Sequence, residues 1–209
     1  MIKWIAQFIV ALAFIASPAL ADGHLFPQRF DVANVASNDT LNIRAQPTGK
    51  SNILGELAYD AKGVEVIRKD ASGKWGQVNA GEGAGWVSLA YMRVTNDPHW
   101  AEMVEPLLCS GTEPFWNLAL TPRAEAHFEF FGEPAFKMTP VWESGAFGEP
   151  YNVLMRHASK HVDISTLVRA QSCNDGMSDR EFGIAVDIFL DTPDDYQNTH
   201  YRGCCQLSK

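Results

Sequence analysis

Two adjacent cysteines, Cys204 and Cys205, constrain this chain more than any other feature of its sequence. The sequence contains only two further cysteines, Cys109 and Cys173. Consecutive Cα atoms lie about 3.8 Å apart, and most disulfides span roughly 4.4 to 6.8 Å, so a bond between the neighbours would be strained. In an oxidising compartment we therefore expect Cys109 and Cys173 each to pair with one of the neighbours. Which cysteine pairs with which stays open.

The adjacent cysteines also predict how the two disulfides are placed. If Cys204 and Cys205 lie on a strand, their side chains point to opposite faces of the sheet. One bond would then lie in the core and the other on the outside.

The start of the sequence predicts export. Lys3 is followed by a mostly apolar run over 4–15, and Ala19-Leu20-Ala21 matches a signal-peptide cleavage site. The run is shorter than the roughly 20 residues that span a bilayer; an uncleaved membrane anchor is the alternative. We expect a signal peptide over 1–21, cleaved after Ala21, and a secreted, periplasmic protein without a stable membrane anchor. Disulfides form in that compartment.

Composition and charge narrow the function classes. Hydrophobic residues make up 46% of the chain and charged residues 20%, which is typical of a globular protein. The formal net charge is −8, and an acidic surface repels phosphate backbones. We therefore expect no nucleic-acid partner.

Short alternating runs between turn residues predict an all-β chain. The runs over 30–94 are short and closely spaced, as in a small barrel. The segment 95–108 has Trp100, Met103 and Val104 at helical spacing, and we interpret it as a linker or short helix. Longer alternating runs in 109–209 predict a disulfide-linked antiparallel β-barrel or sandwich.

Four motifs in the first part resemble a bacterial SH3 domain over 30–94. They are LNIRAQP at 41–47, LGEL at 54–57, KWGQV at 74–78 and GWV at 85–87. Gly76 stands where that family usually has a bulky residue, which affects the adjacent groove. The resemblance implies binding to cell-wall peptide or glycan, or to an envelope protein, and the candidate ligand-binding residues are Asn42, Arg44, Trp75, Trp86 and Tyr91. The alternatives are that Trp75 and Trp86 form the barrel core and that Arg44 pairs with an aspartate.

Three motifs in the second part resemble a family of bacterial envelope proteins that has no assigned biochemical role. They are CSGTEPFW at 109–116, CNDGMSDR at 173–180 and GCC at 203–205. The resemblance implies a family and no reaction. Since these motifs adjoin the cysteines, the disulfides are expected to bring their polar residues together at a barrel mouth. The candidates there are Glu113, Trp116, Asp175, Asp179 and Arg180.

Purely structural roles for the same residues stay open. In the alternative, Glu113 and Arg180 form a salt bridge while Asp179 caps a turn. His157 and His161 have the spacing of two metal ligands on a helix, but their surroundings predict strand and turn. His200 beside Cys204 and Cys205 is a further metal set, which oxidised cysteines exclude. We expect no metal, no cofactor and no catalytic residue.

These observations favour a non-catalytic periplasmic binding protein, whose SH3-type module contacts cell wall or an envelope protein. One alternative is an envelope enzyme that acts on wall fragments, with Glu113 and Asp179 as acid and base. The other is an inhibitor or regulator of an envelope enzyme.

Overall fold

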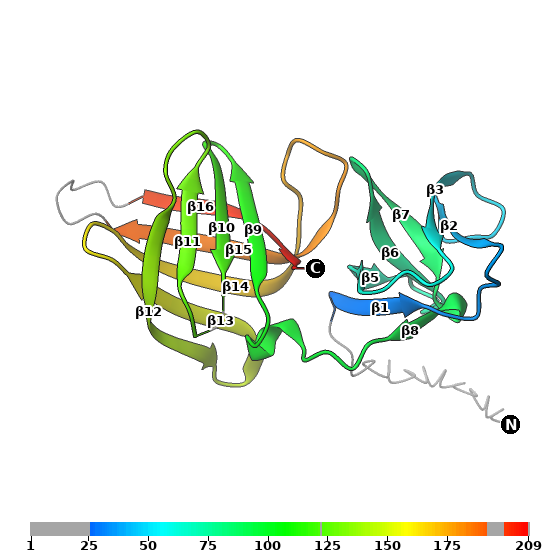
Figure 1. The fold of residues 1–209 in the computed structure, drawn as a ribbon, viewed down its shortest axis with the longest axis horizontal. Helices are drawn as coiled ribbons and strands as arrows, with labels where there is room; N and C mark the ends of the chain where they lie inside the picture. Colours follow the sequence, from blue (N-terminus) through cyan, green and yellow to red (C-terminus); the bar gives the residue numbers. More distant parts are fainter. Residues whose placement is uncertain (1–25, 122, 192–198, 209) are drawn as a thin grey trace, which may run out of the picture.

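The chain folds into two β-rich parts that lie side by side (Figure 1). A computed structural model describes residues 26–121, 123–191 and 199–208. The prediction of an all-β chain is confirmed, and the expected signal peptide at 1–21 lies outside the described residues. Within the described ranges, no helix is long and apolar enough to cross a membrane.

The N-terminal module consists of two small sheets. The first has the strand order β4-β1-β8, with β4 (Val64–Val66), β1 (Gln28–Val32) and β8 (Met92–Val94). The second has the order β3-β2-β7-β6-β5, with β3 (Ile53–Ala58), β2 (Thr40–Arg44), β7 (Gly83–Ser88), β6 (Trp75–Ala80) and β5 (Arg68–Lys69).

Alternation along the strands explains how these two sheets pack. In β2, Leu41 and Ile43 are buried whereas Thr40, Asn42 and Arg44 are partly exposed, because successive side chains of a strand point to opposite faces. The buried face shares one core with both sheets, made of Phe30, Val32, Leu41, Ile43, Val66, Val78 and Val87. The module thus has the compact two-sheet packing expected of a small barrel.

The second part is a closed barrel rather than a sandwich. Its strands follow one another in sequence order, and β16 pairs with β9 to close the ring. The strands are β9 (Leu107–Thr112), β10 (Phe115–Leu120), β11 (Ala126–Phe130), β12 (Phe136–Ala146), β13 (Glu149–Ala158), β14 (Asp163–Cys173), β15 (Phe182–Asp191) and β16 (Thr199–Leu207).

The segment between the two parts is short and irregular. It follows the 3₁₀ turn η1 (Leu89–Tyr91) and β8, and it contains a single further 3₁₀ turn, η2 (Trp100–Glu102). Trp100 and Met103 are buried in the barrel core together with Leu107. Of the three apolar residues that suggested a short helix, Trp100 and Met103 therefore belong to the barrel core, whereas Val104 is exposed.

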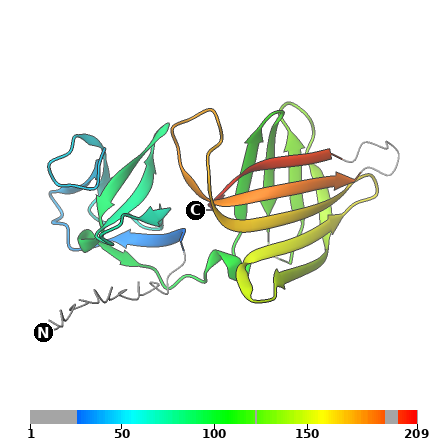
Figure 2. The same cartoon turned by 180° about the vertical axis from the view of Figure 1, so that it is seen from behind.

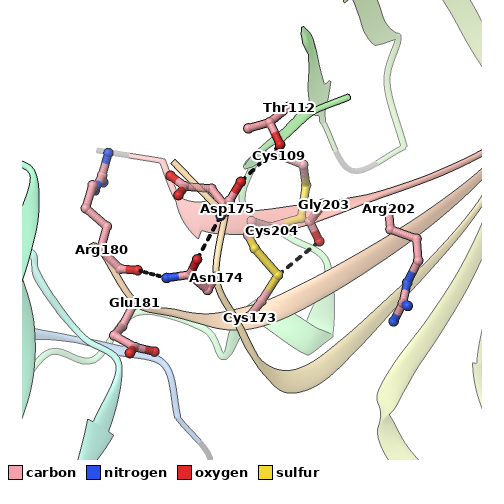
Figure 3. The surroundings of a disulfide bond; sticks show 12 residues. Cys109, Thr112, Cys173, Asn174, Asp175, Arg180, Glu181, Arg202, Gly203 and Cys204 are labelled. Atoms are coloured by element: carbon pink, nitrogen blue, oxygen red, sulfur yellow. Dashed lines mark hydrogen bonds between the residues drawn. A yellow bond between two sulfur atoms is a disulfide. The ribbon is translucent and has the colours of Figure 1, made fainter. Parts of the chain in front are cut away.

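Both disulfides form as the adjacent cysteines predict. Cys109 bonds to Cys205, and Cys173 bonds to Cys204. Cys109 and Cys205 are part of the barrel core, whereas the Cys173–Cys204 bond lies on the outer side, at the base of the loop between β14 and β15 (Figure 3). The two disulfides indicate an oxidising, extracytoplasmic compartment.

The loop 174–181 reaches across to the N-terminal module, as both views of the fold show (Figures 1 and 2). The Asp179 N–H donates to the Glu82 carbonyl at 2.9 Å. The Asn79 amide donates to the Glu181 carbonyl at 2.9 Å and accepts from the Glu181 N–H at 3.0 Å. Arg29 of the module bonds to Glu105 and to the Ser208 carbonyl. Polar contacts therefore join the two parts at more than one place.

Candidate functional site

A groove on the N-terminal module is lined by four of the five residues that the sequence predicts there. Asn42 and Arg44 come from the outer face of β2, Trp75 from the start of β6 and Tyr91 from η1. The groove encloses about 600 Å³, which is within the usual size of small-molecule and peptide pockets.

The groove residues leave both apolar faces and polar groups accessible. Tyr91 is 46% exposed and Trp75 is partly exposed. Arg44 donates from Nη1 to the Ser51 carbonyl at 2.8 Å, so its partner is a backbone oxygen rather than the aspartate considered above. Asp39 lies in the same groove, and its Oδ1 accepts the Thr40 N–H at 2.8 Å.

Trp86 lies outside this groove. Its partly exposed indole is covered by the Arg68 guanidinium, whose Cζ is 5.3 Å from the ring centroid. Neither Trp86 nor Trp75 belongs to the buried core of the module, which consists of aliphatic side chains and Phe30.

Gly76 follows Trp75 because no larger residue fits at that position. A Cβ at Gly76 would lie 2.7 Å from Val66 Cγ1 and 2.9 Å from Leu89 Cδ2. The space that a bulky side chain would take is thus already filled by Val66 and Leu89. On this side the groove is lined by Trp75 and by Ser88, its partner on β7.

The five candidates of the second part do not gather into one site. Asp175 and Arg180 line a hollow of about 290 Å³ together with Ser110, Asn117 and Gln206. Glu113 and Asp179 are exposed and do not line it. Trp116 is buried in the core.

The carboxylate of Asp175 is hydrogen-bonded within its own loop. Burial opposes its ionisation, but the N–H groups of Ser178 and Met177 and the Ser178 hydroxyl all donate to the carboxylate, so the pKa of Asp175 lies below its ordinary value. The Thr112 hydroxyl donates to the Asp175 carbonyl at 3.0 Å. Asp175, and not Asp179, caps the turn.

Arg180 has partners other than Glu113. It donates from Nη2 to Gln206 Oε1 at 2.9 Å, and its Cζ lies 5.2 Å from the Phe182 ring centroid. No ion pair joins Glu113 to Arg180 among the described residues. The salt bridge considered from the sequence is therefore not formed.

The two histidines with metal-ligand spacing point in different directions. His157 is buried among the inward-facing residues of β13, where burial lowers the pKa of its imidazole. His161 is exposed in the next turn. No group of three possible metal-ligating side chains occurs in the ranges the structure describes.

Sequence reasoning missed a polar and aromatic cluster on the outer face of β13–β16. Asp187 pairs with Arg169, with His200 at 2.8 Å and with Arg202 at 3.3 Å. Burial opposes its ionisation, but the hydrogen bonds from His200 and Arg169 and the nearby charges outweigh burial and lower the pKa of Asp187. Alternation places these residues outward, but only the strand register shows that they are neighbours.

Comparison of the chain with protein-family models, with curated proteins and with solved structures gave no match. Both family resemblances stay predictions.

Proposed function

We propose that this chain is a non-catalytic binding protein of the periplasm, exported by its leader, whose N-terminal module binds cell-wall peptide or glycan. The observation that supports the proposal most strongly is the groove of about 600 Å³ in which Asn42, Arg44, Trp75 and Tyr91 meet. These residues come from three separate elements, and all four are candidates that the sequence itself indicates.

The chemistry of the groove suits such a ligand. The flat faces of Trp75 and Tyr91 can stack on the apolar side of a sugar or a peptide, while their N–H and O–H groups fix its orientation. Arg44 can pair with a terminal or side-chain carboxylate through two parallel hydrogen bonds. Asn42 adds an amide that both donates and accepts.

The enzyme alternative has less support. An acid–base pair must lie within hydrogen-bond reach of one reacting group. Glu113 and Asp179 are both exposed, and neither lines the hollow that Asp175 and Arg180 share. We therefore favour binding over catalysis.

Co-sedimentation with purified peptidoglycan tests the proposal. We expect the protein to pellet with the wall, and Trp75→Ala and Arg44→Ala each to weaken binding by about tenfold, as loss of a central contact does. Trp142→Ala is the matched control, because Trp142 is a half-exposed tryptophan (42%) on the barrel, away from the groove. A wild-type protein that stays in the supernatant, or equal losses in all three variants, would contradict the proposal.

A further inference from the structure

Four side chains form a row across the outer face of the barrel. Arg156 on β13 is opposite Ser165 on β14, Ser165 is opposite Phe189 on β15, and Phe189 is opposite His200 on β16. Side chains that are directly opposite on neighbouring strands are in contact distance of one another. The row therefore places an aromatic pair and an arginine on either side of a serine.

The row contains a slot whose floor is Ser165. The rings of Phe189 and His200 stack in parallel, with centroids 4.7 Å apart and planes 6° apart, so His200 covers the face of Phe189 on the β16 side. The other face of Phe189 looks toward β14, where the neighbour is the small Ser165. Neighbouring strands are about 4.8 Å apart, so Phe189 and Arg156 stand about 10 Å apart across the serine. That width admits one ring.

The structure contains a matching hollow. It encloses about 370 Å³ and is lined by Arg156, Asp163, Ser165, Phe189, Leu190, Asp191, Thr199 and His200. Phe189 is 49% exposed, so its ring is accessible from solvent.

The walls of the slot are held in position before any ligand arrives. Arg156 Nη2 bonds to Asp163 Oδ2 at 2.9 Å, and His200 Nε2 bonds to Asp187 Oδ1 at 2.8 Å. These pairs neutralise Arg156 and orient His200, while Asp191 adds a negative charge at the rim. An anionic ligand would therefore find no unpaired cation there.

We propose that this slot is a second binding site and that it takes a neutral saccharide ring. A pyranose has one face of C–H groups, which packs on an aromatic face. Its hydroxyls both donate and accept hydrogen bonds, so they match the carboxylates of Asp163 and Asp191, the Ser165 hydroxyl and the Arg156 guanidinium. A wholly apolar ring would cover the Ser165 hydroxyl and the Asp191 carboxylate without offering them a hydrogen-bond partner, which is unfavourable. The site is separate from the groove of the N-terminal module, and the proposal does not depend on that groove.

Titration of the purified, isotope-labelled protein with neutral trisaccharides tests this proposal. The probes are the N-acetylglucosamine trimer, cellotriose and maltotriose, and the readout is the change in amide NMR shifts. We expect at least one probe to bind with a Kd of about 1 mM, typical for a shallow site. The shifts should map to β13–β16.

Three variants assign the binding to the slot. Phe189→Ala removes the stacking face and Ser165→Leu fills the floor, and each should weaken binding at least tenfold, whereas Phe189→Tyr should keep it. Because the two disruptive variants act in different ways, a folding defect in one leaves the other as a test. Trp75→Ala, in the groove, should leave this binding unchanged. Absence of shifts with all three probes, shifts confined to the groove, or binding that survives Ser165→Leu would overturn the proposal.

Discussion

Trp116 lies against the backbone of two glycines, Gly111 and Gly203, which both belong to the motifs of the second part. A Cβ at either glycine would collide with the indole, and at Gly203 it would also meet the Ser110 carbonyl. The tryptophan was predicted as a ligand-binding candidate, but it is buried in the core beside the Cys109–Cys205 bond. These motif residues therefore pack against one another in the core. The large indole of Trp116 fits because Gly111 and Gly203, which face it, have no side chain.

Substitution of these glycines should destabilise the protein. We expect Gly111→Ala and Gly203→Ala to lower the free energy of unfolding by about 1–3 kcal/mol, because the added methyl group overpacks the core. Gly145→Ala is the control, since a Cβ there would meet nothing within 4 Å, and its effect should stay within about 0.5 kcal/mol. Urea unfolding measures all three. Equal values for the three variants would show that the contact with Trp116 does not limit the core.

Among the elements, the loop 174–181 connects the two parts, and it is fastened at both ends. The residue before the loop, Cys173, is held by its bond to Cys204, and the last residue of the loop, Glu181, is held by reciprocal hydrogen bonds with Asn79. The Cys109–Cys205 bond works differently, because it ties β9 to β16 inside the barrel. The first disulfide therefore supports a contact between the parts, and the second supports closure of the barrel.

The two disulfides should contribute unequally to stability. They close segments with sequence separations of 96 for Cys109–Cys205 and 31 for Cys173–Cys204, and a longer closed loop restricts the unfolded chain more. We expect each paired Cys→Ala replacement to cost about 2–5 kcal/mol, with the larger loss for Cys109 and Cys205, which also leave a cavity in the core. Guanidinium unfolding measures the losses. A larger loss for the outer bond would contradict this ranking.

A carboxyl group with a raised pKa, that of Glu65, lies where the N-terminal module meets the barrel. Glu65 on β4 accepts the Leu207 N–H of β16 through Oε2 at 3.1 Å, while its Oε1 is buried without a hydrogen-bond partner. Burial raises the pKa of Glu65 to about 7, although the Leu207 N–H and the charges of Arg29 and Arg180 act in the opposite direction. The hydrogen bond from Leu207 to Glu65 therefore joins the barrel to the module through a carboxyl group that takes up a proton near neutral pH.

Glu65 should therefore make the folded protein less stable as the pH rises. Its pKa is raised from 4.5 to about 7 on folding, so between these values the folded chain holds a proton that the unfolded chain has lost. The contribution of Glu65 to the free energy of unfolding is full below pH 4.5 and falls by about 3 kcal/mol as the pH rises through 7.

Glu65→Gln isolates this contribution, because glutamine keeps an acceptor for the Leu207 N–H and does not titrate. We expect the variant to lose less stability than the wild type between pH 4.5 and 8, as measured by urea unfolding at a series of pH values. Identical pH profiles for the two proteins would show that Glu65 is not responsible.

The sequence predicted well whatever depends on local pattern. Alternation predicted the strands, and the adjacency of Cys204 and Cys205 predicted both disulfides in outline. The motifs contain three of the groove residues, Asn42, Arg44 and Trp75. Contacts that depend on register or on docking could not be predicted. Phe189 meets Ser165 only because β14 and β15 pair in one particular register, and Glu181 meets Asn79 across a separation that no local pattern spans. The expected cluster of Glu113 with Arg180 did not form, since the Arg180 guanidinium is hydrogen-bonded to Gln206 and packs on the ring of Phe182.

Closure of the barrel by β9 and β16 has a consequence for how the protein is made. Because the strands follow one another in chain order, β9 is synthesised first and its partner last. Until the intervening hairpins exist, β9 has an unpaired edge, and such edges recruit strands from other chains. A chain of this protein in which β16 has not yet paired therefore keeps the edge of β9 open to strands of other chains.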